Sequence, residues 1–361
     1  MLLGLTMIAT GLSGCGKDSN KVQLKEGQTE ILISCWNSGT GVEWLEETAK
    51  VFEEKYPEYK VTINASSNDG VVKAVLDMDD IDKTDIYMTS IASATFDNYV
   101  SLNDILDSTV EGETRPIRDK YNATILDALT DEEGNVKSLY YGGGIVSLVY
   151  NLELFKQAGI TQIPRTTDEL AIVCDQLCEQ DITPLCHFSN GGYYEYMLDY
   201  YHAQYDGIDY YMNNFYACKD ENGKSPSEEV LLNKDGRYYA LTALEKFITP
   251  EYVLSGSNTK SHTEVQTEFV NDKAAMMING SWLSNELATI GGSEKIAMMR
   301  MPILSSIVNK LSTVNNDYLL REVITAVDMV IDGEKQASDF ASGDGYLVDG
   351  VVISAEDWNT L

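Results

Sequence analysis

The sequence predicts an α/β protein with two lobes, and three of its features carry that prediction. In the first third of the chain, short apolar runs alternate with helical patterns, as they do in parallel β-α-β units. Without a leader at residues 1–15, about 345 residues remain, enough for two domains of ordinary size. Three consecutive glycines at 142–144 precede an apolar strand, which suits a backbone that crosses from one domain to the next.

The first half reads as strand, helix, strand, helix, strand. Strands are expected at 31–36, 61–63 and 85–88, and helices at about 41–55 and 71–78. Thr40 followed by Glu43 has the spacing of a capping box, and Tyr56-Pro57 ends the first helix. Parallel pairing of these strands follows from the helices between them.

The second half continues with mixed elements. Strands are expected at 145–150, 274–279 and 296–299, and a helix from Gly236 to Ile248. Asn151 is placed to cap a short helix, Thr166 with Glu169 to start another, and Thr263 with Gln266 to start a third. Beyond Asn309 the sequence is acidic and irregular and predicts no clear element.

The N-terminus carries an apolar run, residues 2–12, which has the length of a signal-peptide core. It leads into Leu12-Ser13-Gly14-Cys15, which resembles a bacterial lipobox, so Cys15 is expected to carry the lipid. An ordinary cleaved signal is the alternative. Because no Lys or Arg precedes the apolar run, we expect the true initiator upstream of Met1.

The net charge of the chain limits the classes of ligand that it is expected to bind. The chain has 57 acidic and 26 basic residues and a formal net charge of -31. Nucleic acid is not expected as a partner, because phosphate binding needs a basic face. A neutral small ligand fits this charge best.

Cysteine and histidine give little support to a metal centre or an active site. Five cysteines other than Cys15 cannot all pair, and they do not have the spacing of a disulfide scaffold. Cys174, Cys178, Cys186 and His187 are near one another in sequence, so a metal site is conceivable, but buried thiols are expected. We therefore predict no metal, no cofactor and no enzyme, although an acid/base pair of carboxylates stays open as an alternative.

Aromatic residues are the most informative group. Nine tyrosines lie between Tyr193 and Tyr216, and the run opens with Gly191-Gly192-Tyr193-Tyr194. A flat apolar face with a polar rim suits the alternating C–H patches and hydroxyls of a sugar. Tyr193, Tyr194 and Trp282 are the candidate stacking residues, against the alternative that the tyrosines are packing residues of a helical hairpin.

Several segments together resemble family 1 extracellular solute-binding proteins of ABC importers, the group that includes maltose-binding protein. The resemblance covers roughly residues 30 to 305. It lies in Trp36-Asn37-Ser38-Gly39, Glu43-Trp44-Leu45, Phe52–Pro57, Asp85–Met88, Leu148–Asn151, Leu154-Phe155, Ala158-Gly159, Pro164, Thr167–Leu170, Phe269–Met276 and Asn279–Trp282.

The resemblance implies a periplasmic-binding-protein-like fold with a hinge and an interlobe cleft. Residues 1–15 would be the lipoprotein signal, 16–29 a flexible tether, 30–143 the first lobe, 144–300 the second, and 301–361 an incomplete return to the first. The expected ligand-binding residues are Trp36, Asn37, Glu43, Tyr87, Tyr141, Tyr193, Tyr194 and Trp282, although Glu43 could serve only as a helix cap.

The function so implied is capture of a mono- or oligosaccharide for an ABC transporter permease. The protein would be a monomer held outside the cytoplasm on the bacterial membrane by lipid on Cys15. Since the family normally continues with further elements, we expect an incomplete C-terminus. The alternatives are a surface adhesin or structural lipoprotein without sugar binding, and a non-functional truncated copy.

Overall fold

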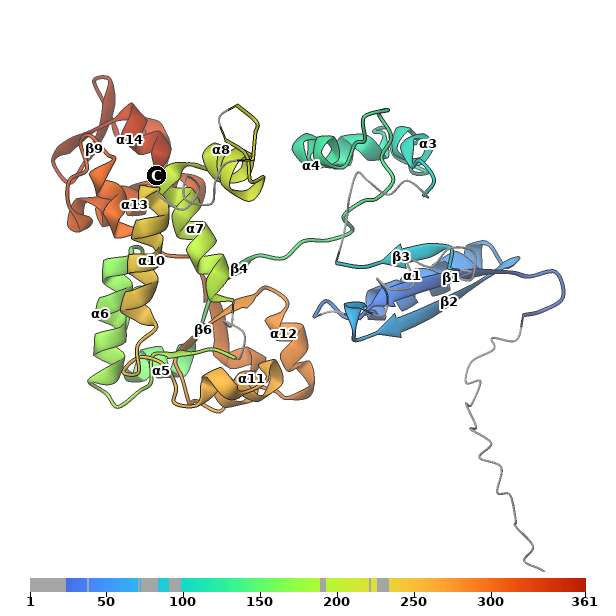
Figure 1. The fold of residues 1–361 in the computed structure, drawn as a ribbon, viewed down its shortest axis with the longest axis horizontal. Coiled ribbons are helices and arrows are strands. Elements are labelled where there is room, and N and C mark those ends of the chain that lie inside the picture. The colour runs from blue at the N-terminus through green and yellow to red at the C-terminus, as the bar shows by residue number, and fades with distance from the viewer. Residues whose placement is uncertain are drawn as a thin grey trace, which may run out of the picture. The chain divides into compact units, whose positions relative to one another are not determined.

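The computed structural model describes residues 24–37, 39–70, 72, 84–90, 99–188, 193–220, 222–225 and 234–361. The chain divides into two compact units, residues 1–141 (unit 1) and residues 142–361 (unit 2) (Figure 1). The expected lipid-bearing Cys15 and the expected helix at 71–78 lie outside the described residues, except for Val72.

Unit 1 contains the predicted parallel sheet. Strand β1 (Thr29–Trp36) lies between β2 (Tyr59–Ser66) and β3 (Ile86–Met88), and both pairings are parallel. Helix α1 (Glu43–Lys55) packs Leu45 against Ile33 and Cys35 of β1. The α1 cap is not the predicted one, because the helix begins two residues later than expected and Val42, not Thr40, occupies the N-cap position.

A second, helical part of unit 1 has its own small core. It contains α3 (Asn103–Asp107), the 3₁₀ turn η1 (Ile117–Lys120) and α4 (Ala123–Ala128). Leu106, Leu126, Leu129 and Val136 are buried together there. Residues 137–145 that follow have no regular structure.

Unit 2 is built around a four-stranded sheet in the order β5-β6-β4-β7. Strand β4 pairs antiparallel with β6 and β7, and β5 pairs parallel with β6. The strands are β4 (Val146–Asn151), β5 (Leu185–Cys186), β6 (Met276–Gly280) and β7 (Ile296–Met299).

Helices surround this sheet. In chain order they are α5 (Leu152–Gln157), α6 (Thr167–Cys178), α7 (Tyr194–Asp206), α8 (Ile208–Tyr210), the π-helical η2 (Tyr211–Tyr216), α10 (Asp235–Phe247), α11 (His262–Val270) and α12 (Leu283–Glu286), with 3₁₀ turns η3 (Ser257–Thr259), η4 (Leu287–Thr289) and η5 (Ser293–Lys295). The large core unites β4, β6, α6, α7 and α10.

Two of the three predicted caps in this half are present. The Asn151 side chain accepts from Glu153 N and Leu154 N, and the Thr166 hydroxyl accepts from Glu169 N. The third was wrong, because α11 is capped by Ser261 and Glu264 rather than by Thr263 and Gln266. The carboxylate of Glu264 returns to the Ser261 amide and completes a capping box two residues earlier than expected.

Residues 301–361 form regular structure, including the part beyond Asn309 where the sequence predicted no clear element. They fold into η6 (Ser305–Asn309), α13 (Asp317–Ile331), η7 (Ala337–Asp339), the antiparallel strands β8 (Ala341–Ser342), β9 (Gly345–Val348) and β10 (Val351–Ser354), and α14 (Ala355–Thr360). Their core includes Leu320, Val323, Ile353 and Trp358.

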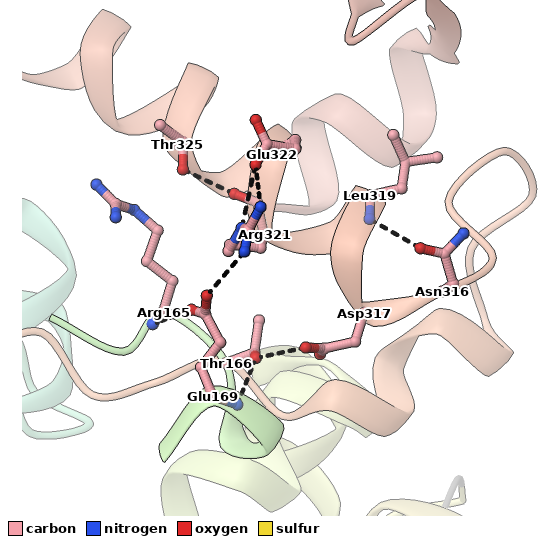
Figure 2. A network of polar contacts seen from close by, with 9 residues as sticks. All are labelled: Arg165, Thr166, Glu169, Asn316, Asp317, Leu319, Arg321, Glu322 and Thr325. Carbon is pink, nitrogen blue, oxygen red and sulfur yellow. Dashed lines mark hydrogen bonds and ion pairs between the residues drawn. The ribbon is translucent and has the colours of Figure 1, made fainter. Parts of the chain in front are cut away.

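This segment packs within unit 2, whereas the resemblance had assigned it to the first lobe. The start of α13 faces the start of α6 in Figure 2, where Thr166 donates to Asp317 at 2.9 Å and Arg321 lies 3.5 Å from Glu169. Thr167 N also donates to Ile303 O at 2.9 Å. These polar contacts give the segment a specific place on the N-terminal end of α6.

Candidate functional site

The carboxyl edge of the parallel sheet in unit 1 holds several of the predicted residues. Trp36 ends β1 and is half-buried, and the exposed Asn37 follows it with its amide bonded to Ser66 O at 2.8 Å. Asp69 lies just past β2 and accepts hydrogen bonds from Ser90, just past β3. Side chains that follow parallel strands gather at one edge, which is where such sheets bind ligands.

An aromatic pair lies at this edge on the α1 side. The rings of Trp44 and Tyr141 are stacked, with centroids 5.6 Å apart and planes 24° apart. Both side chains are exposed, 41% for Trp44 and 47% for Tyr141. Partial burial and the neighbouring Cys35 and Asp69 raise the pKa of Tyr141, so its hydroxyl stays protonated at neutral pH. Trp44 was not among the predicted binding residues.

Two other predicted residues of unit 1 have different surroundings. Tyr87 lies opposite Ser34, so its side chain is on the sheet face away from the core residues Ile33 and Cys35. Its ring meets that of Tyr99 edge to face at 6.0 Å. The Glu43 carboxylate turns back to accept from Val42 N at 3.0 Å, the capping role that the sequence analysis had left open.

In unit 2, the Trp282 ring packs against the backbone of two glycines, Gly144 and Gly280, where any larger residue would collide with it. A β-carbon added to Gly144 would come within 2.6 Å of the Trp282 ring, and one added to Gly280 would overlap it. The end of β6 is held to the start of β4 here, since Ser281 N donates to Ile145 O at 2.9 Å. The ring therefore rests on glycine backbone and is only half-buried.

Trp282 belongs to a group of rings that we call the ring cluster: Phe188, Tyr193, Tyr196, His262 and Trp282. Tyr193 is central, with its ring centroid 6.2 Å from Trp282, 5.4 Å from Tyr196 and 5.1 Å from Phe188. It also lies 6.1 Å from His262. Tyr193 has a φ of 67°, which a bulky residue rarely adopts and which aims its side chain into this cluster rather than along α7.

Polar groups adjoin the ring cluster. Gln266 donates through Nε2 to Glu286, and Glu286 Oε2 lies 3.8 Å from His262 Nε2. Burial lowers the pKa of His262, against the opposing pull of Glu286, so the imidazole is neutral at pH 7. The neutral imidazole and the carboxylate together offer a donor and acceptors to a hydroxyl-rich ligand, whereas the buried Gln266 amide holds Glu286 in place.

Tyr194 is a correction to the predicted site. It is 6% exposed and packs in the large core of unit 2, and burial raises the pKa of its hydroxyl. The cause is helical geometry, because α7 turns Tyr194 inward with Met197, Tyr201 and Tyr205. Only Tyr193 of the pair reaches the ring cluster.

The expectation of buried thiols holds for three of the five described cysteines. Cys35, Cys174 and Cys186 are buried, Cys178 is partly buried and Cys218 is exposed, all as free thiols. Within the described ranges, no group of three or more histidine, cysteine or acidic residues is arranged to hold a metal ion. Among the helices of those ranges, none has the length and apolar character needed to cross a bilayer.

Several solved structures have a fold similar to that of this chain. A structure from Caldanaerobius polysaccharolyticus, described in connection with xylan utilisation, has a TM-score of 0.59 at 18% identity and covers 76% of this chain and 68% of that one. A chitin oligosaccharide binding protein gives 0.56 at 19% identity, over 77% and 68% of the two chains. These similarities show the α/β fold of two-lobed solute-binding proteins.

Sequence comparison agrees. An uncharacterized ABC transporter extracellular-binding protein of Pyrococcus horikoshii is 23% identical over 323 residues, which are 84% of this chain and 68% of that protein. The family model of bacterial extracellular solute-binding proteins matches residues 37–303, well over half of the chain. The match includes the edge residue Asn37, the Trp44–Tyr141 pair and the whole ring cluster. This chain belongs to the bacterial extracellular solute-binding protein family.

Proposed function

We propose that this protein captures a carbohydrate, a mono- or oligosaccharide, outside the cytoplasm and delivers it to an ABC transporter permease. The observation that carries the proposal is the ring cluster, in which half-buried aromatic rings stand beside Gln266 and Glu286. A sugar presents C–H groups on its faces and hydroxyls at its rim, so it needs both kinds of partner. The net charge of -31 favours a neutral ligand.

The proposed roles follow from the surroundings of each side chain. Trp282 and Tyr193 stack on the faces of a sugar ring, and Glu286, held by the buried Gln266, accepts from its hydroxyls. Within unit 1, the candidate stacking rings are Trp44, Tyr141 and Trp36, and Asn37 is the candidate polar residue. Tyr87 and Glu43 stay secondary candidates, because one lies on a sheet face and the other caps a helix.

Related proteins support a sugar over other solutes. The solved structures that resemble this chain include proteins described in connection with xylan utilisation and chitin oligosaccharides, and the Pyrococcus relative is named as an ABC transporter component. Binding alone is the proposed activity. A ligand signals to a permease only through its different affinity for two arrangements of the protein.

The proposal includes a lipid anchor on Cys15 and a monomeric state. The lipid anchor is supported by the apolar run at 2–12 and by the small residues that precede Cys15. The polar residues 16–29 would serve as a tether between membrane and folded units.

The decisive test is a thermal-shift screen of the folded chain against mono- and disaccharides and longer fragments of xylan, chitin, mannan and starch. At least one sugar is expected to raise the unfolding temperature, since a ligand at 100 times its Kd adds about 2.7 kcal/mol. Trp282→Ala should abolish the shift, and Trp282→Phe should keep part of it. As a control, Tyr238→Ala removes an exposed ring of α10 and should leave the shift intact.

If no sugar raises the unfolding temperature of the folded wild-type protein, the carbohydrate proposal is wrong. That outcome would favour the alternative of a surface lipoprotein that keeps the fold without sugar binding. The unliganded unfolding temperature of each variant separates loss of binding from loss of folding.

A further inference from the structure

Helix α7 carries two exposed tyrosines that continue the ring cluster along its outer face. Tyr196 is 41% exposed and Tyr200 is 39% exposed. They are four residues apart, so they are neighbours on one side of the helix. Tyr193, one turn before Tyr196, is on the same side and contacts it ring to ring at 5.4 Å.

The opposite face of α7 is the one that packs. Tyr194, Met197, Tyr201 and Tyr205 are buried there in the core of unit 2. Tyr196 and Tyr200 therefore do not hold the helix in place. Their exposure leaves an apolar ring surface in water beside a site that we propose binds sugar, which is unfavourable unless something covers it.

The spacing of these rings sets the length of a ligand that could use them. From Tyr193 to Tyr200 the helix rises about 10 Å, and the Trp282 ring adds to this length, with its centroid 6.2 Å from that of Tyr193. That span is longer than one sugar ring. Tyrosine suits such a surface, because its hydroxyl stays wet while its ring face takes a C–H patch. Glu195, exposed beside them, adds an acceptor for hydroxyls.

We propose that Tyr196 and Tyr200 form an extension of the binding site, and that the ligand is a linear oligosaccharide that continues from Trp282 and Tyr193 along α7. The inference rests on the proposed carbohydrate function and narrows it from any sugar to a chain of several units. A monosaccharide would fill the site at Trp282 and leave the two tyrosines uncovered.

Calorimetry with a length series tests the inference. The probes are disaccharide and tetrasaccharide pairs of one linkage: xylobiose and xylotetraose, chitobiose and chitotetraose, mannobiose and mannotetraose, maltose and maltotetraose. For the linkage that binds, the wild-type tetrasaccharide should bind more tightly than the disaccharide. The double variant Tyr196→Ala/Tyr200→Ala should weaken the tetrasaccharide about tenfold, the size expected for two lost ring contacts.

The disaccharide affinity of Tyr200→Ala, which changes no ring of the ring cluster, should stay at the wild-type value, and the double variant should lose less affinity for the disaccharide than for the tetrasaccharide. Tyr196→Phe/Tyr200→Phe, which keeps both rings, should restore most of the tetrasaccharide affinity, and Tyr238→Ala should change neither. Equal loss for both lengths, or no loss for either, would overturn the extension while the proposed sugar binding stands. If no sugar binds the wild type, the proposed function itself fails, and the extension fails with it.

Discussion

At the scale of single residues, glycines decide where the ring of Trp282 can lie. Gly144 and Gly280 leave the space that the ring fills, and a β-carbon at either would collide with it. Within the run of three glycines at 142–144, Gly142 and Gly143 have nothing within 4 Å of an added β-carbon. Only the last of the three is required by close packing against a side chain.

We therefore predict that Gly144→Ala displaces the Trp282 ring and weakens binding of any sugar found in the screen by tenfold or more, about 1.4 kcal/mol. Gly143→Ala, the same change one residue earlier, should have no effect on affinity. Calorimetry measures both, and the tryptophan emission spectrum reports the move of the ring. Wild-type affinity in Gly144→Ala would mean that Trp282 does not hold the ligand.

The contacts between candidate site residues were harder to predict from the sequence than the candidate residues themselves. The sequence singled out Tyr141 but not Trp44, because Trp44 lies off the buried stripe of α1 and its partner is nearly a hundred residues away. Likewise, Tyr193 and Tyr194 looked equivalent until the helix placed one in the ring cluster and the other in the core. His262 and Glu286 had no local signal at all.

At the scale of elements, one hydroxyl joins α6 to α13. Thr166 is fully buried, caps α6 through Glu169 N at 3.2 Å and donates to Asp317 at 2.9 Å (Figure 2). Its partner Asp317 is the first residue of α13. The Thr166 hydroxyl therefore stabilises the first turns of both helices.

Thr166→Ala is predicted to lower the free energy of unfolding by about 1–3 kcal/mol, since it removes a cap and leaves Asp317 without its donor. Thr166→Ser keeps the oxygen and should lose about 1 kcal/mol or less, the share of one methyl group. Urea unfolding of both variants measures the difference. Equal destabilisation by Ala and Ser would show that the methyl group, not the hydroxyl, carries the contact.

Local pattern predicted most elements with strong periodicity and missed those with weak signals. Strands β1, β2, β3, β4, β6 and β7 and helices α1, α6 and α10 lie within a few residues of their expected ranges, whereas the two-residue β5 was not predicted. Helix α13 was missed although Leu320, Val323 and Val327 recur at helical spacing behind the cap Asn316. Its acidic flanks hid that pattern, and the packing of residues 301–361 within unit 2 depends on contacts about 150 residues apart.

At the scale of the whole molecule, the chain has separate cores joined by a stretch without regular structure. Residues 137–145 form neither helix nor strand, and Tyr140, Tyr141 and Ile145 are 48%, 47% and 65% exposed. Unit 1 and unit 2 each bury their own apolar residues on either side of it. An exposed, irregular segment between two cores is where a protease cuts first.

Brief digestion with chymotrypsin is therefore expected to cleave after Tyr140 or Tyr141 among the earliest sites, with fragment masses read by mass spectrometry. Tyr141 is also a proposed sugar contact stacked on Trp44, so a bound sugar should slow this cut and leave cleavage at the exposed Tyr216 unchanged. If the segment resisted cleavage as long as the helices of unit 2, residues 137–145 would not be an exposed, irregular connection. If it were cut equally fast with and without sugar, Tyr141 would not belong to the binding site.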